Sequence, residues 1–178
     1  MTDAFEHIRI ERCRETDEAE ALSHLAGSTF TQTFGHLYDP KDLAMFLEEK
    51  HAPDMYRDLI RDERFGVWLA KEEGAIIGYV VAGPCDLPAP DMPDRSGELM
   101  RFYIDQRYRG AGLGGRLFEK ALAWLHENFD HVYLSVYAEN FGAQRFYERY
   151  GFEKVHEYHF MVGNHADPEF IMKRREGA

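Results

Sequence analysis

A glycine-rich segment in the second half of the chain has the composition of a phosphate-binding turn. It reads Gln-Arg-Tyr-Arg-Gly-Ala-Gly-Leu-Gly-Gly over residues 106–115, between a strand-like stretch and a long amphipathic helical pattern. A turn with so little side-chain bulk exposes successive backbone N–H groups at a helix N-terminus, where the helix dipole favours negative charge. Arg109 adds a charged partner for a phosphate oxygen. The segment therefore predicts a phosphate cradle rather than a simple change of direction.

Two nucleotide-binding motifs compete for this cradle. A P-loop is excluded because no Gly-Lys-Ser/Thr ends the run. The dinucleotide fingerprint G-x-G-x-x-G does fit residues 110–115, and Glu139 could supply the acidic residue after the next strand. However, residues 105–109 separate the apolar strand from the first glycine, where a dinucleotide fold needs a tight turn, and only 63 residues follow Gly115. This context disfavours a dinucleotide-dependent oxidoreductase, which stays an alternative.

The spacing Arg-x-x-Gly-x-Gly, formed by Arg109, Gly112 and Gly114, resembles the cofactor motif of the GNAT superfamily of N-acetyltransferases. The second motif of that superfamily, Asn…Ala…Phe-Tyr…Gly-Phe, is matched by Asn140, Ala143, Phe146, Tyr147, Gly151 and Phe152. The two motifs stand in the expected order, with a predicted helix and strand between them. The resemblance covers about residues 8–173 and departs at Gln106, where many members have proline.

The resemblance implies a single α+β domain over residues 1–178, with the three α/β/α layers of the GNAT fold. Its central sheet would be twisted, mixed and mostly antiparallel, with about seven strands and about four to five flanking helices. Two neighbouring parallel strands, here 98–105 and 132–137, would splay apart in a V beyond a bulge and admit the pantetheine arm of acetyl-CoA. The residues implied to contact acetyl-CoA are Phe102, Tyr103, Ile104, Arg109, Gly110, Ala111, Gly112, Leu113, Gly114, Gly115, Asn140, Ala143 and Phe146.

Acetyl transfer to an alkyl amine requires two proton movements. An amine with a pKa of about 10 arrives protonated at neutral pH and must lose a proton before it attacks the thioester. We expect Glu98 to accept that proton directly or through a water; the alternative is a solvated carboxylate at a strand start. The resemblance assigns Tyr147 as the acid that protonates the leaving thiolate. Phe146, Tyr147 and Tyr150 would also suit a buried helix face.

The charge of the chain limits its partners. Its 178 residues hold 21 Lys and Arg against 32 Asp and Glu, a net charge of −11, which disfavours nucleic acid. Residues 1–97 carry 10 basic and 20 acidic side chains (−10), whereas residues 98–178 carry 11 and 12 (−1). An acidic half that faces the substrate would attract a cationic amine. Solubility alone would explain the same charge.

The composition also predicts where the protein works. With 44% hydrophobic residues the chain can form a core, yet it lacks a run of about 18 apolar residues. Its first residues lack the pattern of a secretory signal. We therefore expect a cytoplasmic protein with no membrane partner. The superfamily resemblance makes a homodimer plausible.

Periodic spacing predicts the elements around the candidate site. The predicted strands are 7–13, 66–70, 75–82, 98–105, 132–136, 153–161 and 169–174, and the predicted helices follow Thr16-Asp17 and Asp39-Pro40 and span 53–61, 113–125 and 140–150. Thr16 and Asp17 are expected to cap the first helix, and Asp39 the second. Pro84, Pro88, Pro90 and Pro93 predict an ordered loop.

Four short segments and the acidic proline loop indicate the kind of amine acceptor. Segments 29–34, 102–104, 159–163 and 170–173 resemble the bacterial polyamine N-acetyltransferase branch, including its spermidine/spermine type. Asp86, Asp91 and Asp94 on the proline loop would help to attract a polycation. A protein N-terminus, an aminoglycoside and a non-catalytic acetyl-CoA sensor are the alternatives.

No metal is expected. Cys13 and Cys85 lie far apart without metal-ligand spacing. His156 and His159, three apart in a predicted strand, would point to opposite faces of the sheet. His126 and Asp130 fit a motif of another acyltransferase class, but they end a helical pattern, and His165 and Asp167 are expected in a turn.

Overall fold

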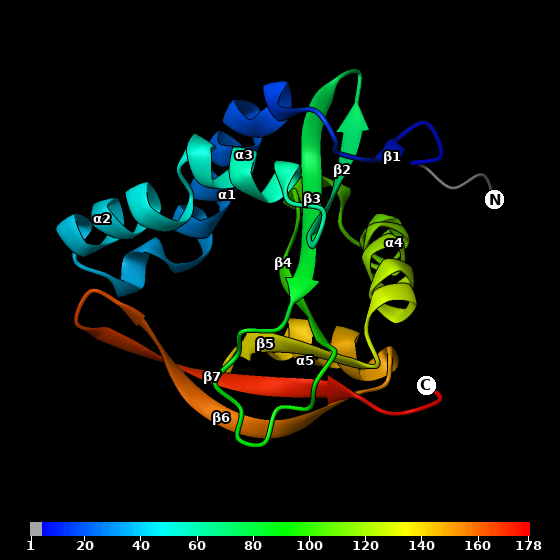
Figure 1. Cartoon of the computed structure of the whole chain (residues 1–178). Coiled ribbons are helices and arrows are strands. Elements are labelled where there is room, and N and C mark those ends of the chain that lie inside the picture. Colours follow the sequence, from blue (N-terminus) through cyan, green and yellow to red (C-terminus); the bar gives the residue numbers. More distant parts are fainter. Residues whose placement is uncertain (1–4) are drawn as a thin grey trace.

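The computed structural model describes residues 5–178 and contains one seven-stranded sheet (Figure 1). The strands are β1 (Arg9–Arg12), β2 (Gly66–Glu72), β3 (Ala75–Pro84), β4 (Ser96–Ile104), β5 (His131–Tyr137), β6 (Phe152–Val162) and β7 (His165–Arg174). They lie in the order β1-β2-β3-β4-β5-β7-β6. Within residues 5–178, β4 and β5 pair in parallel and all other neighbours pair antiparallel. This mixed, mostly antiparallel sheet confirms the expected fold class.

Helices cover both faces of the sheet (Figure 1). They are α1 (Ala19–Phe34), α2 (Pro40–Lys50), α3 (Pro53–Arg61), α4 (Leu113–Asn128) and α5 (Phe141–Arg149). Helices α1 and α3 contact β3 and β2, α4 contacts β2 to β5, and α5 contacts β6. The layers are those that the resemblance implied.

The two faces of the sheet carry separate cores, because side chains alternate along each strand. On β2, Trp68 and Ala70 pack with α4, whereas Val67 and Leu69 pack with α1 and α3. Helix α4 adds six buried residues, namely Leu113, Leu117, Phe118, Ala121, Leu122 and Leu125. We call the two sides the α4 face and the α1 face.

The helix starts follow the capping rules in one case and depart from them in another. Asp39 caps α2 as predicted, since its side chain accepts a hydrogen bond from the backbone N–H of Lys41 at 2.9 Å. The predicted cap at Thr16 and Asp17 is wrong, because both residues lie inside a 3-10 turn, Thr16–Glu18, and α1 has no side-chain cap. A capping residue needs the extended backbone, which is found one residue earlier, at Glu15.

Strands β4 and β5 separate partway along their length. Their pairing runs from Ser96 with His131 to Leu99 with Leu134 and then stops. On its other side β4 continues beside β3, but the register skips Met100, which makes Met100 the extra residue of a bulge. A bulge bends its strand and increases the local twist. The expected V-shaped splay is thereby confirmed, and we call it the fork.

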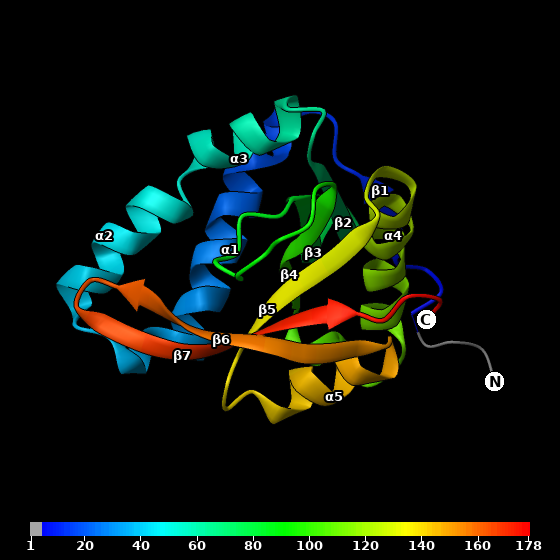
Figure 2. The same ribbon diagram turned by 60° about the horizontal axis from the view of Figure 1, so that its bottom comes forward.

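A hairpin and a loop close the α1 face around the fork. Figure 2 shows the tip of the β6–β7 hairpin against α2, and the loop between β3 and β4 beside β5. The tip packs through Val162 on Tyr38 and Phe46. His165 and Asp167, expected in a turn, lie in β7 instead, because Gly163 with φ 56° allows a turn of two residues. The prolines form the predicted loop except for Pro84, which ends β3 opposite Gly97.

Candidate active site

The turn before α4 has the backbone geometry that its glycines suggested. Gly110 and Gly112 have φ of 86° and 81°, a region that costs other residues about 1–2 kcal/mol. A Cβ at either position would meet nothing within 4 Å, so the backbone conformation, not crowding, requires glycine. Gly112 is the N-cap of α4, and no side chain caps the helix there. The first N–H groups of α4 are therefore available to an anion.

The remaining cradle residues contribute packing and backbone. A Cβ on Gly115 would lie 3.0 Å from the Tyr150 hydroxyl, and one on Gly114 would lie 3.6 Å from the Phe102 ring. The Leu113 side chain is fully buried in the core of the α4 face, so only its backbone can face the cradle. The small residues thus bring α4 close to β4 and α5.

Arg109 lies between the cradle and the fork. Its Nε donates a hydrogen bond to the carbonyl oxygen of Ile104 at 3.1 Å. Its guanidinium carbon lies 5.9 Å from the centre of the Tyr103 ring. Both contacts hold a cation at the end of β4, beside the edge that β5 leaves open.

Aromatic rings line the α4 face of the fork. Phe102 of β4 stacks on Phe146 of α5 at 5.6 Å, and both meet Phe118 of α4. Asn140 caps α5 by accepting a hydrogen bond from the Ala143 N–H at 3.1 Å. The side chain of Asn140 therefore serves the helix, and contact of α5 with a cofactor stays a prediction.

Tyr147 is buried on the α4 face. It is 9% exposed, and its ring lies against Phe118 and Phe152. Burial raises the pKa of its phenol well above the ordinary value, and the charge of Glu169 adds to this. Its hydroxyl has no hydrogen-bond partner among residues 5–178. The phenol is therefore protonated and unengaged at neutral pH.

Glu98 lies on the α1 face at the closed end of the fork. It pairs with Tyr133, one residue before the last β4–β5 pair, and is 8% exposed. One carboxylate oxygen accepts a hydrogen bond from the backbone N–H of Asp86, in the proline loop, at 3.3 Å. Burial raises the pKa of Glu98 to about 7, an effect that the Arg101 charge opposes. A carboxyl with this pKa can exchange a proton near neutral pH.

A second carboxyl on the α1 face, Glu169 of β7, escaped the sequence analysis. It pairs with Tyr137 and accepts a hydrogen bond from the Ser135 hydroxyl of β5. Burial raises its pKa to about 7, although the Ser135 bond acts in the opposite direction. In the sequence it is one acidic residue at the start of a predicted strand. Its neighbours come from other strands, so only the β5–β7 register could have revealed it.

The fork thus separates two kinds of group. Glu98 and Glu169 lie on the α1 face, whereas Tyr147 belongs to the core of the α4 face. The two faces meet where β4 and β5 part. A molecule held in the fork would have carboxyl groups on one side and a phenol on the other.

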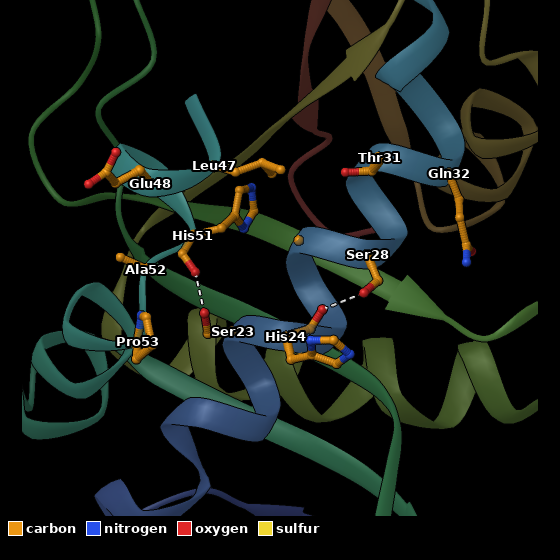
Figure 3. A pocket seen from close by; sticks show the side chains of 11 residues that line it. Ser23, His24, Ser28, Thr31, Gln32, Leu47, Glu48, His51, Ala52 and Pro53 are labelled. Carbon is orange, nitrogen blue, oxygen red and sulfur yellow. Dashed lines mark hydrogen bonds between the residues drawn. The ribbon is translucent and has the colours of Figure 1, made fainter. Parts of the chain in front are cut away.

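A groove of about 710 Å³ lies outside this arrangement, between α1 and the junction of α2 with α3 (Figure 3). Two of its polar side chains bond to backbone nearby: Ser28 to the carbonyl of His24 at 2.8 Å, and Ser23 to the carbonyl of His51. None of the residues that line it comes from β4 or β5. The candidate site is therefore the fork, not this groove.

Two other kinds of site can be assessed in the described part of the chain. Residues 5–178 contain no group of three or more His, Cys, Asp or Glu side chains placed to hold a metal ion. No helix within the same residues has the length and apolar composition needed to cross a membrane.

Curated relatives match this chain over different shares of its length. It is 26% identical over 171 residues to an uncharacterized N-acetyltransferase of Lactobacillus delbrueckii subsp. lactis, covering 94% of this chain and 96% of that protein. It is 35% identical over 85 residues to the spermine/spermidine N(1)-acetyltransferase of Bacillus subtilis, covering 46% and 55% of the two chains. The fold is similar to that of the PaiA N-acetyltransferase of Thermoplasma acidophilum in complex with coenzyme A. That match has a TM-score of 0.72 at 18% identity and covers 94% and 98% of the two chains.

One protein-family match covers both sequence motifs and the fork. Residues 21–152 match the family described as "Acetyltransferase (GNAT) family". This range includes the cradle, both strands of the fork and α5. The chain therefore belongs to the acetyltransferase (GNAT) family and is an N-acetyltransferase that takes its acetyl group from acetyl-CoA.

Proposed function

We propose that this enzyme acetylates a primary amine of a small polycation, such as spermidine or spermine. The observation that carries the proposal is Glu98, a buried carboxyl with a pKa of about 7 at the closed end of the fork. The net charge of −11 and the partial similarity to a spermine/spermidine acetyltransferase support it.

The residues of the α4 face would hold acetyl-CoA. The cradle of Gly110, Ala111, Gly112, Leu113, Gly114 and Gly115 would offer its backbone N–H groups to the pyrophosphate, with Arg109 beside it. The free edge of β4 over Phe102, Tyr103 and Ile104 would bond to the pantetheine arm as an added strand. The backbone suits both roles. No side chain caps α4, so its N–H groups are open to the pyrophosphate. On the β5 side β4 has no strand partner beyond Leu99, so its edge is open to the pantetheine arm.

Glu98 would act as the base. A protonated amine with a pKa of about 10 does not attack a thioester, so a group nearby must accept its proton. Above pH 7 Glu98 is mostly ionised and can accept it; below pH 7 Glu98 is mostly protonated and cannot. A buried carboxylate also attracts the incoming ammonium group.

Tyr147 would act as the acid. Its phenol stays protonated throughout the neutral range, since burial raises its pKa. Its hydroxyl is free to donate a hydrogen bond to the sulfur of the leaving thiolate. The thiolate, with a thiol pKa of about 8.5, needs a proton at pH 7.

The acidic surroundings favour a cationic acceptor. Asp86 contacts Glu98 through its backbone, and Asp91 and Asp94 lie on the same loop. On the other side of β5, Glu169 and Asp167 lie on the α1 face of β7. These charges would raise the local concentration of a polyamine relative to a neutral amine.

The test is coenzyme A release from acetyl-CoA with spermidine, spermine, an aminoglycoside, a short peptide and a neutral monoamine. Turnover of the polyamines at a higher kcat/KM than the monoamine is expected, with the preference shrinking as salt screens the field. Equal kcat/KM for spermidine and the monoamine would reject charge selection. Selective turnover of the peptide would identify a protein acceptor instead, and binding of acetyl-CoA without any turnover would indicate a sensor.

A further inference from the structure

Ser135 occupies a distinctive place at the fork. It is the first residue of β5 beyond the last β4–β5 pair, Leu99 with Leu134. Leu134 and Val136 belong to the core of the α4 face, so the side chain of Ser135 points to the α1 face. Its hydroxyl therefore lies where β4 and β5 part, on the same face as Glu98.

Three strands place polar groups around this hydroxyl. Ser135 of β5 donates a hydrogen bond to Glu169 of β7. The hydroxyl of Tyr158, on β6, lies 2.8 Å from the oxygen of Ser135. Tyr158 pairs with Glu169 across the β6–β7 hairpin, so the register of two strand pairs fixes the cluster.

Glu169 carries its charge without a basic partner. No ion pair involves it within residues 5–178, although a buried carboxylate is normally paired with a cation when its role is structural. Its neighbours are instead acidic or phenolic. The charge of Asp167 on β7 raises the pKa of Glu169. The charge of Glu169 in turn raises the pKa of four tyrosines, namely Tyr137 on β5, Tyr158 on β6, Tyr38 after α1 and Tyr147 on α5.

The cluster also connects the two faces of the fork. The charges of Glu98 and Glu169 both raise the pKa of Tyr158, so Tyr158 lies within electrostatic reach of the two carboxyls. Glu169 in turn influences Tyr147, the phenol on the α4 face. The cluster therefore lies within electrostatic reach of both proposed proton-transfer groups.

We infer that Glu169 is a second proton-holding residue of the acetyl transfer, acting through the hydroxyl of Ser135, on the β5 side of the fork opposite Glu98. This inference rests on the proposed acetylation of an amine. Glu169 is a positioning residue, because Ser135 stands between it and the reacting nitrogen.

The proton balance of the reaction gives this second residue a task. The amine enters as R–NH₃⁺ and leaves as R–NH–CO–CH₃, so its nitrogen gives up two protons while the N–C bond forms and the C–S bond breaks. Glu98 accepts the first proton before the attack. The Ser135 hydroxyl accepts the second while it passes its own proton to Glu169, and Tyr147 gives a proton to the sulfur. One of the two protons then restores Tyr147, and the other leaves to water.

The kinetic test uses Glu169→Gln, Ser135→Ala and Ser135→Thr with the best amine of the panel. Glu169→Gln is expected to lower kcat about 100-fold, the scale of general acid–base catalysis, with the KM for acetyl-CoA within about twofold. Ser135→Ala should also lower kcat, and Ser135→Thr should restore it because threonine keeps the hydroxyl. The double variant Glu169→Gln/Ser135→Ala should be no slower than Glu169→Gln alone, since both changes interrupt one route.

Glu157→Gln is the matched control, because Glu157 is an exposed carboxylate on the same hairpin that pairs with Lys154. It should leave kcat and KM unchanged. Unchanged kcat in Glu169→Gln, or losses that multiply in the double variant, would overturn the inference.

A second readout does not depend on turnover, and therefore separates this inference from the acceptor proposal. The ¹³C carboxyl resonance of Glu169, assigned by its loss in Glu169→Gln, should titrate with a midpoint of about 7. Ser135→Ala should raise that midpoint, since the lost hydrogen bond favours the ionised form. A midpoint near the ordinary glutamate value, unmoved by Ser135→Ala, would reject the cluster even if spermidine is acetylated. Should no amine be turned over while this titration behaves as expected, the acceptor proposal fails and so does the role of Glu169 in acetyl transfer, while the hydrogen bond between Ser135 and Glu169 is confirmed.

Discussion

The two faces of the fork are built in different ways. On the α4 face the candidate cofactor site consists of backbone: glycines with positive φ, uncapped N–H groups of α4 and the open edge of β4. On the α1 face the candidate acceptor site consists of side chains from distant strands, with Glu98 on β4 and Glu169 on β7. Backbone geometry follows from local sequence, whereas the second arrangement depends on the register of the sheet. One face is therefore suited to a shared cofactor, and the other can change with single substitutions.

A substitution of Glu98, on the α1 face, should have its main effect on activity and not on cofactor binding. Glu98→Gln should lower kcat/KM for the best amine about 10²–10⁴-fold at pH 7, because the carboxylate that accepts the first ammonium proton is then absent. The affinity for coenzyme A, measured by calorimetry, should stay within about twofold of wild type. A loss of less than about threefold in kcat/KM would place the base elsewhere.

The same substitution should stabilise the fold at alkaline pH. Burial raises the pKa of Glu98 from 4.5 to about 7, so the folded state binds the proton more tightly than the unfolded state. That contribution to stability is complete below pH 4.5 and is lost as the pH rises toward 7 and beyond. Glu98→Gln should thus increase the free energy of unfolding at pH 8 by about 3 kcal/mol, with little change at pH 4. Denaturant unfolding at both pH values checks this, and destabilisation at pH 8 would contradict it.

A substitution in the cradle should affect the other face alone. Gly112→Val should weaken coenzyme A binding about tenfold, because the valine side chain crowds the N–H groups of the cradle. Its φ of 81° also costs the fold about 1–2 kcal/mol. Gly74→Val is the matched control: Gly74 has φ 87° and open surroundings, but lies in the β2–β3 turn. It should lose similar stability and keep its coenzyme A affinity. Equal affinity losses in both variants would mean that strain alone, not the cradle, weakens binding.

Substitutions of Asn140 should have small effects, and they distinguish a helix cap from a contact with the cofactor. Asn140→Ala removes the hydrogen bond to the Ala143 N–H and should destabilise the protein by about 1 kcal/mol. Asn140→Ser, which can still cap, should recover most of that loss. If coenzyme A affinity drops in both variants while stability recovers in Asn140→Ser, Asn140 contacts the cofactor after all.

The same contrast explains what the sequence could predict. The glycine spacing before α4, the Asp39 cap and the alternation in β5 are local, and each predicted the element that the structure contains. Glu98 could be named as a candidate base because it is a carboxylate at the start of the strand that leads to the glycine turn, and its role stays a prediction. Glu169 was missed, and Asp167 was placed in a turn, because both depend on how β7 pairs with β5 and β6. A cytoplasmic location, a homodimer and the roles of individual site residues stay predictions.

The pH dependence of kcat/KM for spermidine, compared between the wild type and Glu98→Gln, shows whether Glu98 is the base. We predict that log kcat/KM of the wild type falls below pH 7 with a limiting slope of about two, because both Glu98 and Glu169 must be ionised, and that this slope is about one, at much lower activity, in Glu98→Gln. The same limiting slope in both proteins would contradict the assignment of Glu98 as the base.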